Sequence, residues 1–231
     1  APAARREGAV GGDEAIPPQR DEMREARTAR GRDETETLGF EKLSKLQADI
    51  NNLGVVSLSR CLVGLMGNFK TIAPQLCHLH TLDLSFNLLE LLEDVWSIVD
   101  SLSIKSLNLS GNRFENRKLT SKEHTVPVES VTELNLTSTL VSSSQMSQIL
   151  AKFPNLNSLA IADNHYSSDD VETIFTNKKL NQKLKKIDLS GNVLKTVPDV
   201  VMSFEEVNLG YNMIQDLSSI AKWAPISKLR T

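Results

Sequence analysis

One short segment of the sequence has residue types that could bind a metal ion. In the stretch CHLH, Cys77, His78 and His80 lie close together. Thiolate and imidazole groups are zinc ligands, but a structural zinc site needs about four of them. No second pair lies at a ligand spacing, so we expect Cys77 to pack at the end of a convex segment, His80 to enter a strand and no metal to bind.

A second segment, GLMGNFKT, has the residue types of a phosphate-binding loop in Gly64, Gly67, Lys70 and Thr71. Its spacing differs from G-x-x-x-x-G-K-[ST], so the backbone amides and the lysine would not reach the same phosphate. No G-x-S-x-G elbow is present, and no nucleophile, base and orienting acid stand out. We therefore expect no catalytic residues, no cofactor and no enzyme activity.

The composition of the chain narrows the class of protein. The sequence has 231 residues, is 40% hydrophobic and has a net charge of -3, which does not favour nucleic acid as a partner. No run of about eighteen apolar residues occurs, so no membrane span is expected. Two cysteines and no leader-like segment favour a reducing, cytoplasmic setting, and the sequons at Asn108 and Asn135 fall inside predicted strands, where a glycan would be awkward.

The elements that must position any functional residue belong to an internal repeat. The template L-x-x-L-x-L-x-x-N-x-L is typical of leucine-rich repeats, whose period is about 20 to 29 residues. Seven copies occur, 20 to 28 residues apart, beginning at Leu53, Leu79, Ile104, Val131, Leu156, Leu184 and Phe204. An eighth copy starts at Ile226 and stops within its strand. We expect an α/β, right-handed solenoid with a parallel sheet on its concave side and with helices and irregular turns on its convex side.

The same position of each repeat carries a small polar side chain. In a solenoid this side chain is expected to be buried and to bond the backbone of neighbouring turns, which would otherwise lack partners. The residues of this predicted structural ladder are Cys61, Asn87, Asn112, Thr139, Asn164, Asn192 and Asn212.

Between the strands, helical periodicity predicts convex helices. One apolar face combines Val95, Ile98, Val99 and Leu102, and another combines Met146, Ile149, Leu150 and Phe153 before Pro154. In SSDDVETIF, Ser168 is the expected N-cap, with Asp169 and Asp170 in the first turn.

The two ends of the chain differ in composition. Residues 1–37 have no lysine, no aromatic residue and few aliphatic ones, which predicts a disordered, charged linker or tail. Residues 38–231 are expected to form one leucine-rich repeat domain, opened by a helix over 39–50 with Phe40, Leu43 and Ile50 on one stripe. An irregular insertion is expected at 115–130.

The strand residues between the buried leucines should form columns on the concave face, which repeat proteins use to bind other proteins. Phe86 and Tyr211 are aromatic anchors at the strand ends. The predicted partner-binding residues are Thr81, Asp83, Ser85, Phe86, Asn108, Glu133, Asn135, Lys186, Asp188, Glu206, Asn208 and Tyr211.

Part of the sequence resembles a known family. Residues 39–64 (GFEKLSKLQADINNLGVVSLSRCLVG) and 79–114 (LHTLDLSFNLLELLEDVWSIVDSLSIKSLNLSGNRF) resemble the repeat region of tubulin-folding cofactor E. The matching residues are Val56, Ser57, Leu58, Cys61, Val63 and the run Asp83 to Leu89. Beyond residue 114 the match is to the general repeat alone. The family's CAP-Gly and ubiquitin-like domains have no counterpart in the 231 residues.

The resemblance implies a cytoplasmic, cytoskeleton-associated chaperone module that binds α-tubulin and works with other tubulin cofactors in assembly and disassembly of the heterodimer. We expect it to act as a monomer. A general leucine-rich repeat scaffold for a signalling or ciliary partner stays open as the alternative.

Overall fold

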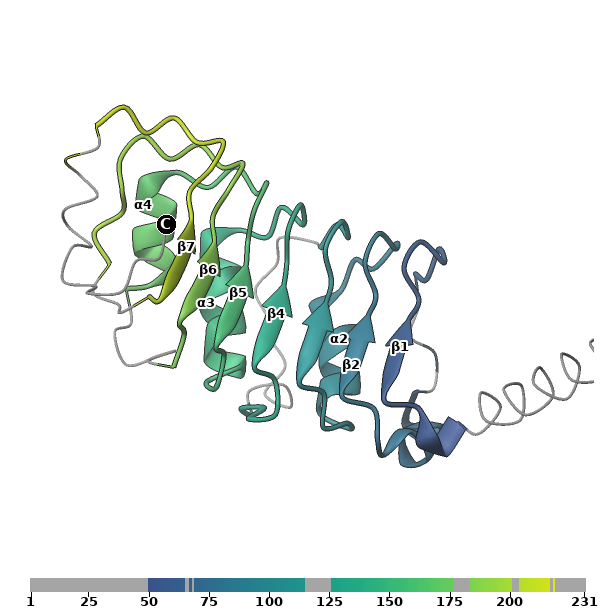
Figure 1. Ribbon diagram of the computed structural model, residues 1–231. Helices are drawn as coiled ribbons and strands as arrows, with labels where there is room; N and C mark the ends of the chain where they lie inside the picture. The colour runs from purple at the N-terminus through teal and green to yellow at the C-terminus, as the bar shows by residue number, and fades with distance from the viewer. Residues whose placement is uncertain are drawn as a thin grey trace, which may run out of the picture. The chain divides into compact units, whose positions relative to one another are not determined.

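The computed structural model describes residues 50–64, 67, 69–114, 126–176, 183–200, 204–216 and 218 (Figure 1). The chain divides into two units, Ala1–Asp49 and Ile50–Thr231, and all described residues belong to the second. The predicted tail over 1–37, the opening helix before Ile50, most of the insertion at 115–130 and the eighth repeat at Ile226 lie outside the described residues. The division into a tail and one repeat domain therefore stays a prediction.

The second unit is built on one parallel sheet of seven short strands in chain order. The strands are β1 (Val55–Ser57), β2 (Thr81–Asp83), β3 (Ser106–Asn108), β4 (Glu133–Asn135), β5 (Ser158–Ala160), β6 (Lys186–Asp188) and β7 (Glu206–Asn208). We number the seven coils of the solenoid by the strand that each contains. Each strand has three residues because the template places one buried residue between two that face outward.

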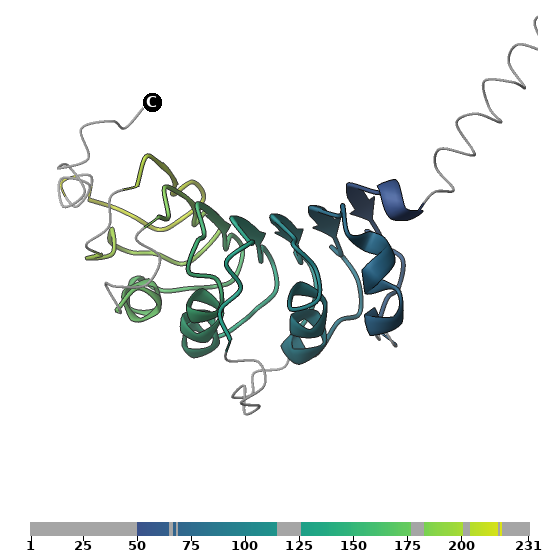
Figure 2. The same cartoon turned by 90° about the horizontal axis from the view of Figure 1, so that it is seen from below.

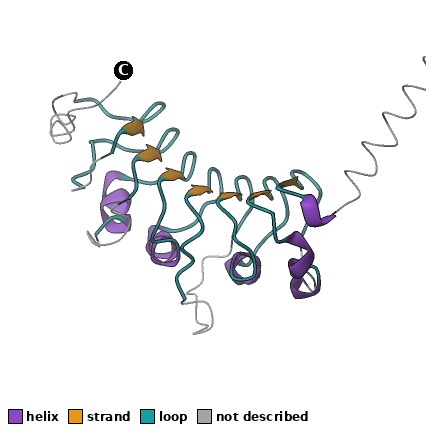
Figure 3. Cartoon of the chain, turned by 60° about the horizontal axis from the view of Figure 1, so that its bottom comes forward, coloured by secondary structure: helices purple, strands orange, loops and turns teal. Residues whose placement is uncertain are grey.

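Most helices lie on the outer side of the curve of this unit, opposite the strands (Figures 2 and 3). These are η2 (Phe69–Thr71), η3 (Ala73–Leu76), α2 (Leu92–Val99), α3 (Ser143–Lys152) and α4 (Ser168–Ile174), whereas η1 (Ile50–Asn52) lies at the end of the sheet, before β1. After β6, the described residues of coil 6 form turns and no helix, and this repeat is the shortest, at 20 residues. The strands line the inner side, so the α/β leucine-rich repeat architecture is confirmed.

The core lies between the sheet and the helices. The central residues of the inner strands, Leu82, Leu107, Leu134, Leu159 and Ile187, are at most 4% exposed. The two predicted helical faces are buried against them, and the ring of Trp96 in α2 meets that of Phe153 edge to face with centroids 5.3 Å apart. At the two ends of the sheet, Val56 and Val207 are only half-buried.

One helix cap differs from its prediction. Ser167, and not Ser168, is the N-cap of α4, because the Ser167 Oγ accepts the Asp170 N–H while the Asp170 carboxylate accepts the Ser167 N–H. This reciprocal pair is a capping box, which requires the cap three residues before its acidic partner. The Ser168 hydroxyl instead donates to the Thr196 carbonyl of the next coil.

Candidate functional site

The sheet pairing aligns the predicted concave columns in register. Val55, Thr81, Ser106, Glu133, Ser158, Lys186 and Glu206 pair along the first column, and Ser57, Asp83, Asn108, Asn135, Ala160, Asp188 and Asn208 along the second. Parallel pairing without any shift in register keeps every outward residue next to its equivalent in the neighbouring coil. The concave face is therefore a grid of seven coils by two outward-facing columns, whose residues are exposed or half-buried.

Most side chains of the second column form hydrogen bonds with backbone N–H groups. In five coils an Asp or Asn Oδ1 accepts the N–H group two residues later, at 2.9 to 3.1 Å: Asp83 to Ser85, Asn108 to Ser110, Asn135 to Thr137, Asp188 to Ser190 and Asn208 to Gly210. Such turns end the strand by replacing a ladder hydrogen bond with a side-chain one. These side chains therefore shape the turn and offer only their remaining polar atoms to a partner.

Neighbouring hydrogen-bond donors keep the carboxyl group of Asp83 ionised. Partial burial raises the pKa of its carboxyl, but hydrogen bonds from the Ser85 N–H and from the Ser57 hydroxyl oppose this, so the pKa lies below its ordinary value of 3.8. Asp83 is therefore an anion at neutral pH, on the concave side of coil 2.

The first column carries the exposed charges of the concave face. Glu133, Lys186 and Glu206 are exposed, while Thr81 is half-buried. The Lys186 Nζ lies 2.9 Å from a Glu206 carboxylate oxygen across β6 and β7, and this hydrogen bond raises the pKa of the lysine. The pair is exposed, so water and salt compete with it and a partner could separate it at little cost.

The residues two positions after the second column form a third column that is buried in part. This burial corrects the assignment of Ser85 as a binding residue. Ser85 is 3% exposed and donates its hydroxyl to Ser59 Oγ at 2.9 Å. Ser110 and Ala162, its equivalents in coils 3 and 5, are also buried. The strand ends at Asp83, so the chain has already turned toward the core when it reaches Ser85.

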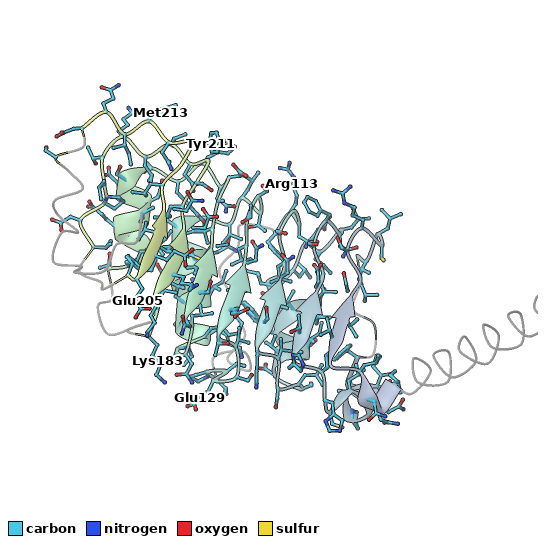
Figure 4. All side chains as sticks on the ribbon, in the orientation of Figure 1. Arg113, Glu129, Lys183, Glu205, Tyr211 and Met213 are labelled. Carbon is cyan, nitrogen blue, oxygen red and sulfur yellow. The ribbon has the colours of Figure 1, made fainter. Side chains whose placement is uncertain are left out.

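The two aromatic anchors stand at the edge of the sheet where the strands end. Phe86 is 50% exposed and Tyr211 is 94% exposed. Figure 4 shows Tyr211 on this edge together with Arg113 and Met213, whereas Glu129, Lys183 and Glu205 lie at the opposite edge. Phe86 and Tyr211 occupy equivalent positions in coils 2 and 7, so they belong to one row of residues that runs along this edge.

This row has an unusual backbone. The residue before each ladder position has a φ between 52° and 70° in all seven coils: Arg60, Phe86, Gly111, Ser138, Asp163, Gly191 and Tyr211. The left-handed region costs about 1–2 kcal/mol for a residue with a Cβ, and glycine avoids that cost. Only coils 3 and 6 use glycine, so Phe86 and Tyr211 are placed in a conformation that their side chains disfavour.

Behind the row, the ladder asparagines join the coils. The Asn87 Oδ1 accepts the N–H groups of Cys61 and Val63, both at 3.0 Å, and its Nδ2 donates to the Leu58 and Leu84 carbonyls, both at 2.9 Å. Asn112, Asn164, Asn192 and Asn212 likewise donate to a carbonyl of the preceding coil and accept an N–H group from it. An amide suits this position because it has donors and an acceptor on one short side chain.

Two ladder positions without asparagine behave differently. Cys61 is exposed, and its Sγ contacts the Ser59 carbonyl of its own coil at 3.6 Å. Thr139 is fully buried, and its hydroxyl donates to Leu136 O of its own coil at 2.7 Å. A hydroxyl has a single proton, so Thr139 cannot also donate to the preceding coil as an amide does.

The residues weighed for metal binding are not gathered into a site. The Nδ1 atom of His80 lies 3.0 Å from the Thr81 hydroxyl, and Cys77 is exposed as a free thiol. In the part of the chain that the structure describes, no group of three or more His, Cys, Asp or Glu side chains could hold a metal ion. Over the same residues, no helix is long and apolar enough to cross a bilayer.

Sequence reasoning missed several exposed side chains on the edge where the strands end. Leu62 and Leu88 are 74% and 58% exposed, and they occupy equivalent positions directly after Cys61 and Asn87. Arg113 is the exposed equivalent in coil 3. The sequence did contain a signal for Leu62 and Leu88, because an apolar residue directly after the ladder position has no place in the core of the repeat template.

Curated proteins of one kind are similar to most of this chain. The tubulin-specific chaperones E of Bos taurus and Homo sapiens are 31% and 29% identical over 166 and 165 residues, which is 71% of this chain. The chain spans about 30% of the length of these curated relatives. Residues 132–223 match a family described as protein of unknown function VcgC/VcgE.

A solved internalin (inlF) from Listeria monocytogenes is 18% identical and has a TM-score of 0.40, over 75% of this chain and 52% of that one. The repeat architecture itself rests on the sheet and the ladder described above. The chain is a leucine-rich repeat protein whose repeats resemble part of tubulin-specific chaperone E.

Proposed function

We propose that this chain is a protein-binding repeat module that holds α-tubulin during assembly and disassembly of the tubulin heterodimer, together with other tubulin cofactors. The observation that carries the proposal is the 31% identity to tubulin-specific chaperone E over 166 residues. The proposed role is binding and not catalysis, in the cytoplasm and at the cytoskeleton, with the chain acting as a monomer.

The proposed contact surface combines members of the two outward-facing columns with the two aromatic anchors, Phe86 and Tyr211. Its members are Thr81, Asp83, Phe86, Asn108, Glu133, Asn135, Lys186, Asp188, Glu206, Asn208 and Tyr211, with Ser85 excluded by its burial. The surface is polar and mixed in charge, with aromatic anchors at its edge. Such a composition suits a partner that must be released again, because exposed ion pairs contribute little to affinity and aromatic anchors contribute most.

Purified αβ-tubulin tests the proposal in a sedimentation-velocity experiment with the 231-residue chain. Co-sedimentation of the two proteins supports tubulin as the partner. If no complex with tubulin forms, and the same chain recovers a different partner from cytosol, the result favours a general leucine-rich repeat scaffold.

A further inference from the structure

Exposed apolar side chains are concentrated on the edge where the strands end. Among the described residues with large exposed apolar side chains, Leu58, Leu62, Phe86, Leu88, Tyr211 and Met213 all follow a strand on this side. The opposite edge carries polar and charged groups such as Glu129, Lys183 and Glu205 (Figure 4). We use the term exit patch for Arg60, Leu62, Phe86, Leu88 and Arg113, which lie in coils 1 to 3.

Contacts of the exit patch link the three coils to one another. The Arg60 guanidinium lies 4.8 Å from the centroid of the Phe86 ring, and the ring itself covers the backbone of Gly111. The Leu88 N–H donates to the Val63 carbonyl at 2.9 Å, which holds Leu88 beside the turn that carries Leu62. Contacts therefore run from coil 1 through coil 2 to coil 3.

The backbone of the exit patch is strained where its side chains are exposed. Arg60, Leu62 and Phe86 have φ values of 59°, 59° and 53°. Glycine would relieve the strain at these positions, as it does at Gly111 and Gly191, the equivalents of Arg60 and Phe86 in coils 3 and 6. Three large side chains held in this conformation and turned to solvent point to a contact with something outside the chain.

The charge of the exit patch indicates what that contact is. Arg60 and Arg113 are exposed, and among the described residues neither forms an ion pair with a carboxylate. By contrast, Lys185 and Lys186 in coil 6 are paired with Glu205 and Glu206. A guanidinium held over an aromatic ring still has N–H groups that can bind a carboxylate.

We infer that the exit patch is the docking site for an acidic segment of the partner protein that also carries apolar side chains. The apolar groups of the segment pack on Leu62, Phe86 and Leu88, while its carboxylates meet Arg60 and Arg113. Arginine and aromatic residues are the side chains most enriched at the centre of protein interfaces. This inference rests on the proposed function in that it takes the partner to be a protein.

The test begins with a phage-displayed library of random linear peptides, selected on the intact 231-residue chain. We expect the enriched peptides to combine Asp or Glu with large apolar residues. Binding of those peptides should weaken about tenfold in Arg113→Glu. Binding by the wild type should also weaken as salt is raised, because salt screens the attraction between arginine and carboxylate. Lys105→Glu is the matched control, because Lys105 is exposed in the same coil but precedes β3, and it should leave affinity unchanged.

A Leu88→Ser variant supplies a second readout that does not depend on charge, and it should also weaken binding about tenfold. Circular dichroism of each variant confirms that it is folded. The inference is overturned if nothing is enriched above the bare support, if the enriched peptides have no acidic bias, or if both variants bind them as well as the wild type does.

Tubulin then separates this inference from the proposed function. Loss of αβ-tubulin binding in Arg113→Glu and Leu88→Ser, but not in Lys105→Glu, supports both. Unchanged tubulin binding in the first two variants overturns the exit patch as the docking site and leaves the proposed function standing. Failure of the wild-type chain to bind tubulin, with acidic apolar peptides still bound at the exit patch, overturns the proposed function alone.

Discussion

The ring of Phe86 lies across the backbone of Gly111, in the next coil, so closely that a Cβ on residue 111 would come within 2.7 Å of the ring Cε1 atom. Gly111 also has a φ of 70°, which side chains disfavour. Gly111 therefore has two roles. It allows the left-handed turn of coil 3, and its lack of a side chain leaves room for the Phe86 ring.

Replacing this glycine should have two separable effects. Gly111→Ala should lower the free energy of unfolding by about 1–2 kcal/mol for the left-handed backbone, plus a cost for displacing the Phe86 ring. Urea unfolding measures the total. Gly67→Ala is the control, because Gly67 has a φ of 56° but a Cβ added there would meet no atom within 4 Å. Equal losses in the two variants would contradict the close packing of Phe86 on Gly111.

The ladder predicts a loss of stability without any loss of core volume. Asn87→Leu removes the acceptor of two backbone N–H groups and the donor to the Leu58 and Leu84 carbonyls, so it should destabilise the protein by about 1–3 kcal/mol. Denaturant titration gives the value. Asn212→Leu should cost less, because Asn212 is half-exposed and water can replace its bonds. A wild-type unfolding curve for Asn87→Leu would show that the ladder amide is dispensable.

The α4 capping box makes part of the stability dependent on pH. Hydrogen bonds from the Ser167 hydroxyl and N–H, and one from Ser143, lower the pKa of Asp170 from its ordinary value of 3.8 despite partial burial. A carboxyl with a lowered pKa in the folded state stabilises the fold above its unfolded pKa, and this stability is lost as the pH falls through the folded pKa.

Asp170→Asn should therefore be less stable than the wild type at neutral pH, and the difference should shrink as the pH falls below 3.8. Thermal unfolding at a series of pH values follows it. Asp169→Asn, one residue earlier in the same turn, keeps the capping box and should retain the wild-type pH dependence of stability. A constant difference for Asp170→Asn at all pH values would refute the assignment.

On the convex side, the buried side chain of Lys152 connects three segments of the chain through its ammonium group. The Lys152 side chain is 2% exposed, and its Nζ donates to Asp100 Oδ1 at 2.6 Å and to the Val126 carbonyl at 2.8 Å. Lys152→Met should cost about 1–3 kcal/mol, since the carbonyl loses a buried donor while Asp100 is still reached by water. Lys185→Met, which breaks an exposed pair with Glu205, should cost at most about 1 kcal/mol.

Hydrogen exchange locates the effect of the Lys152 substitution. The Val128 N–H donates to the Lys152 carbonyl, so its protection should fall if Lys152 holds residues 126–128 in place. Protection that stays at the wild-type level would mean that the backbone bond alone anchors this segment.

The repeat period was enough to predict the concave grid. A fixed template with alternating strand residues determines which side chains face outward, so the pairing of Thr81 with Ser106 and of Asp188 with Asn208 follows from the alignment of repeats. The burial of the two helical faces follows from their periodicity for the same reason.

Other features depend on the path of the chain after each strand, which the period does not encode. The prediction that Ser85 is exposed is wrong because the strand ends two residues earlier than simple alternation assumes. Serines stand next to each other at 167 and 168, and only the distance to Asp170 identifies the cap. The pairing of Lys152 with Asp100 joins residues in different coils, and no local pattern predicts it.

We propose that the concave face binds α-tubulin with Phe86 and Tyr211 as its aromatic anchors. The most direct test compares αβ-tubulin affinity, by sedimentation velocity, between the wild type and a combined Asp83→Asn, Phe86→Asn and Tyr211→Asn variant. Asparagine keeps the turn at residue 83, as Asn108 does in coil 3, and it tolerates positive φ at residues 86 and 211, so the variant should unfold like the wild type. We predict saturable binding by the wild type and affinity at least about tenfold weaker for the variant. Equal affinity of the two proteins, or no complex with the wild type, would contradict the claim.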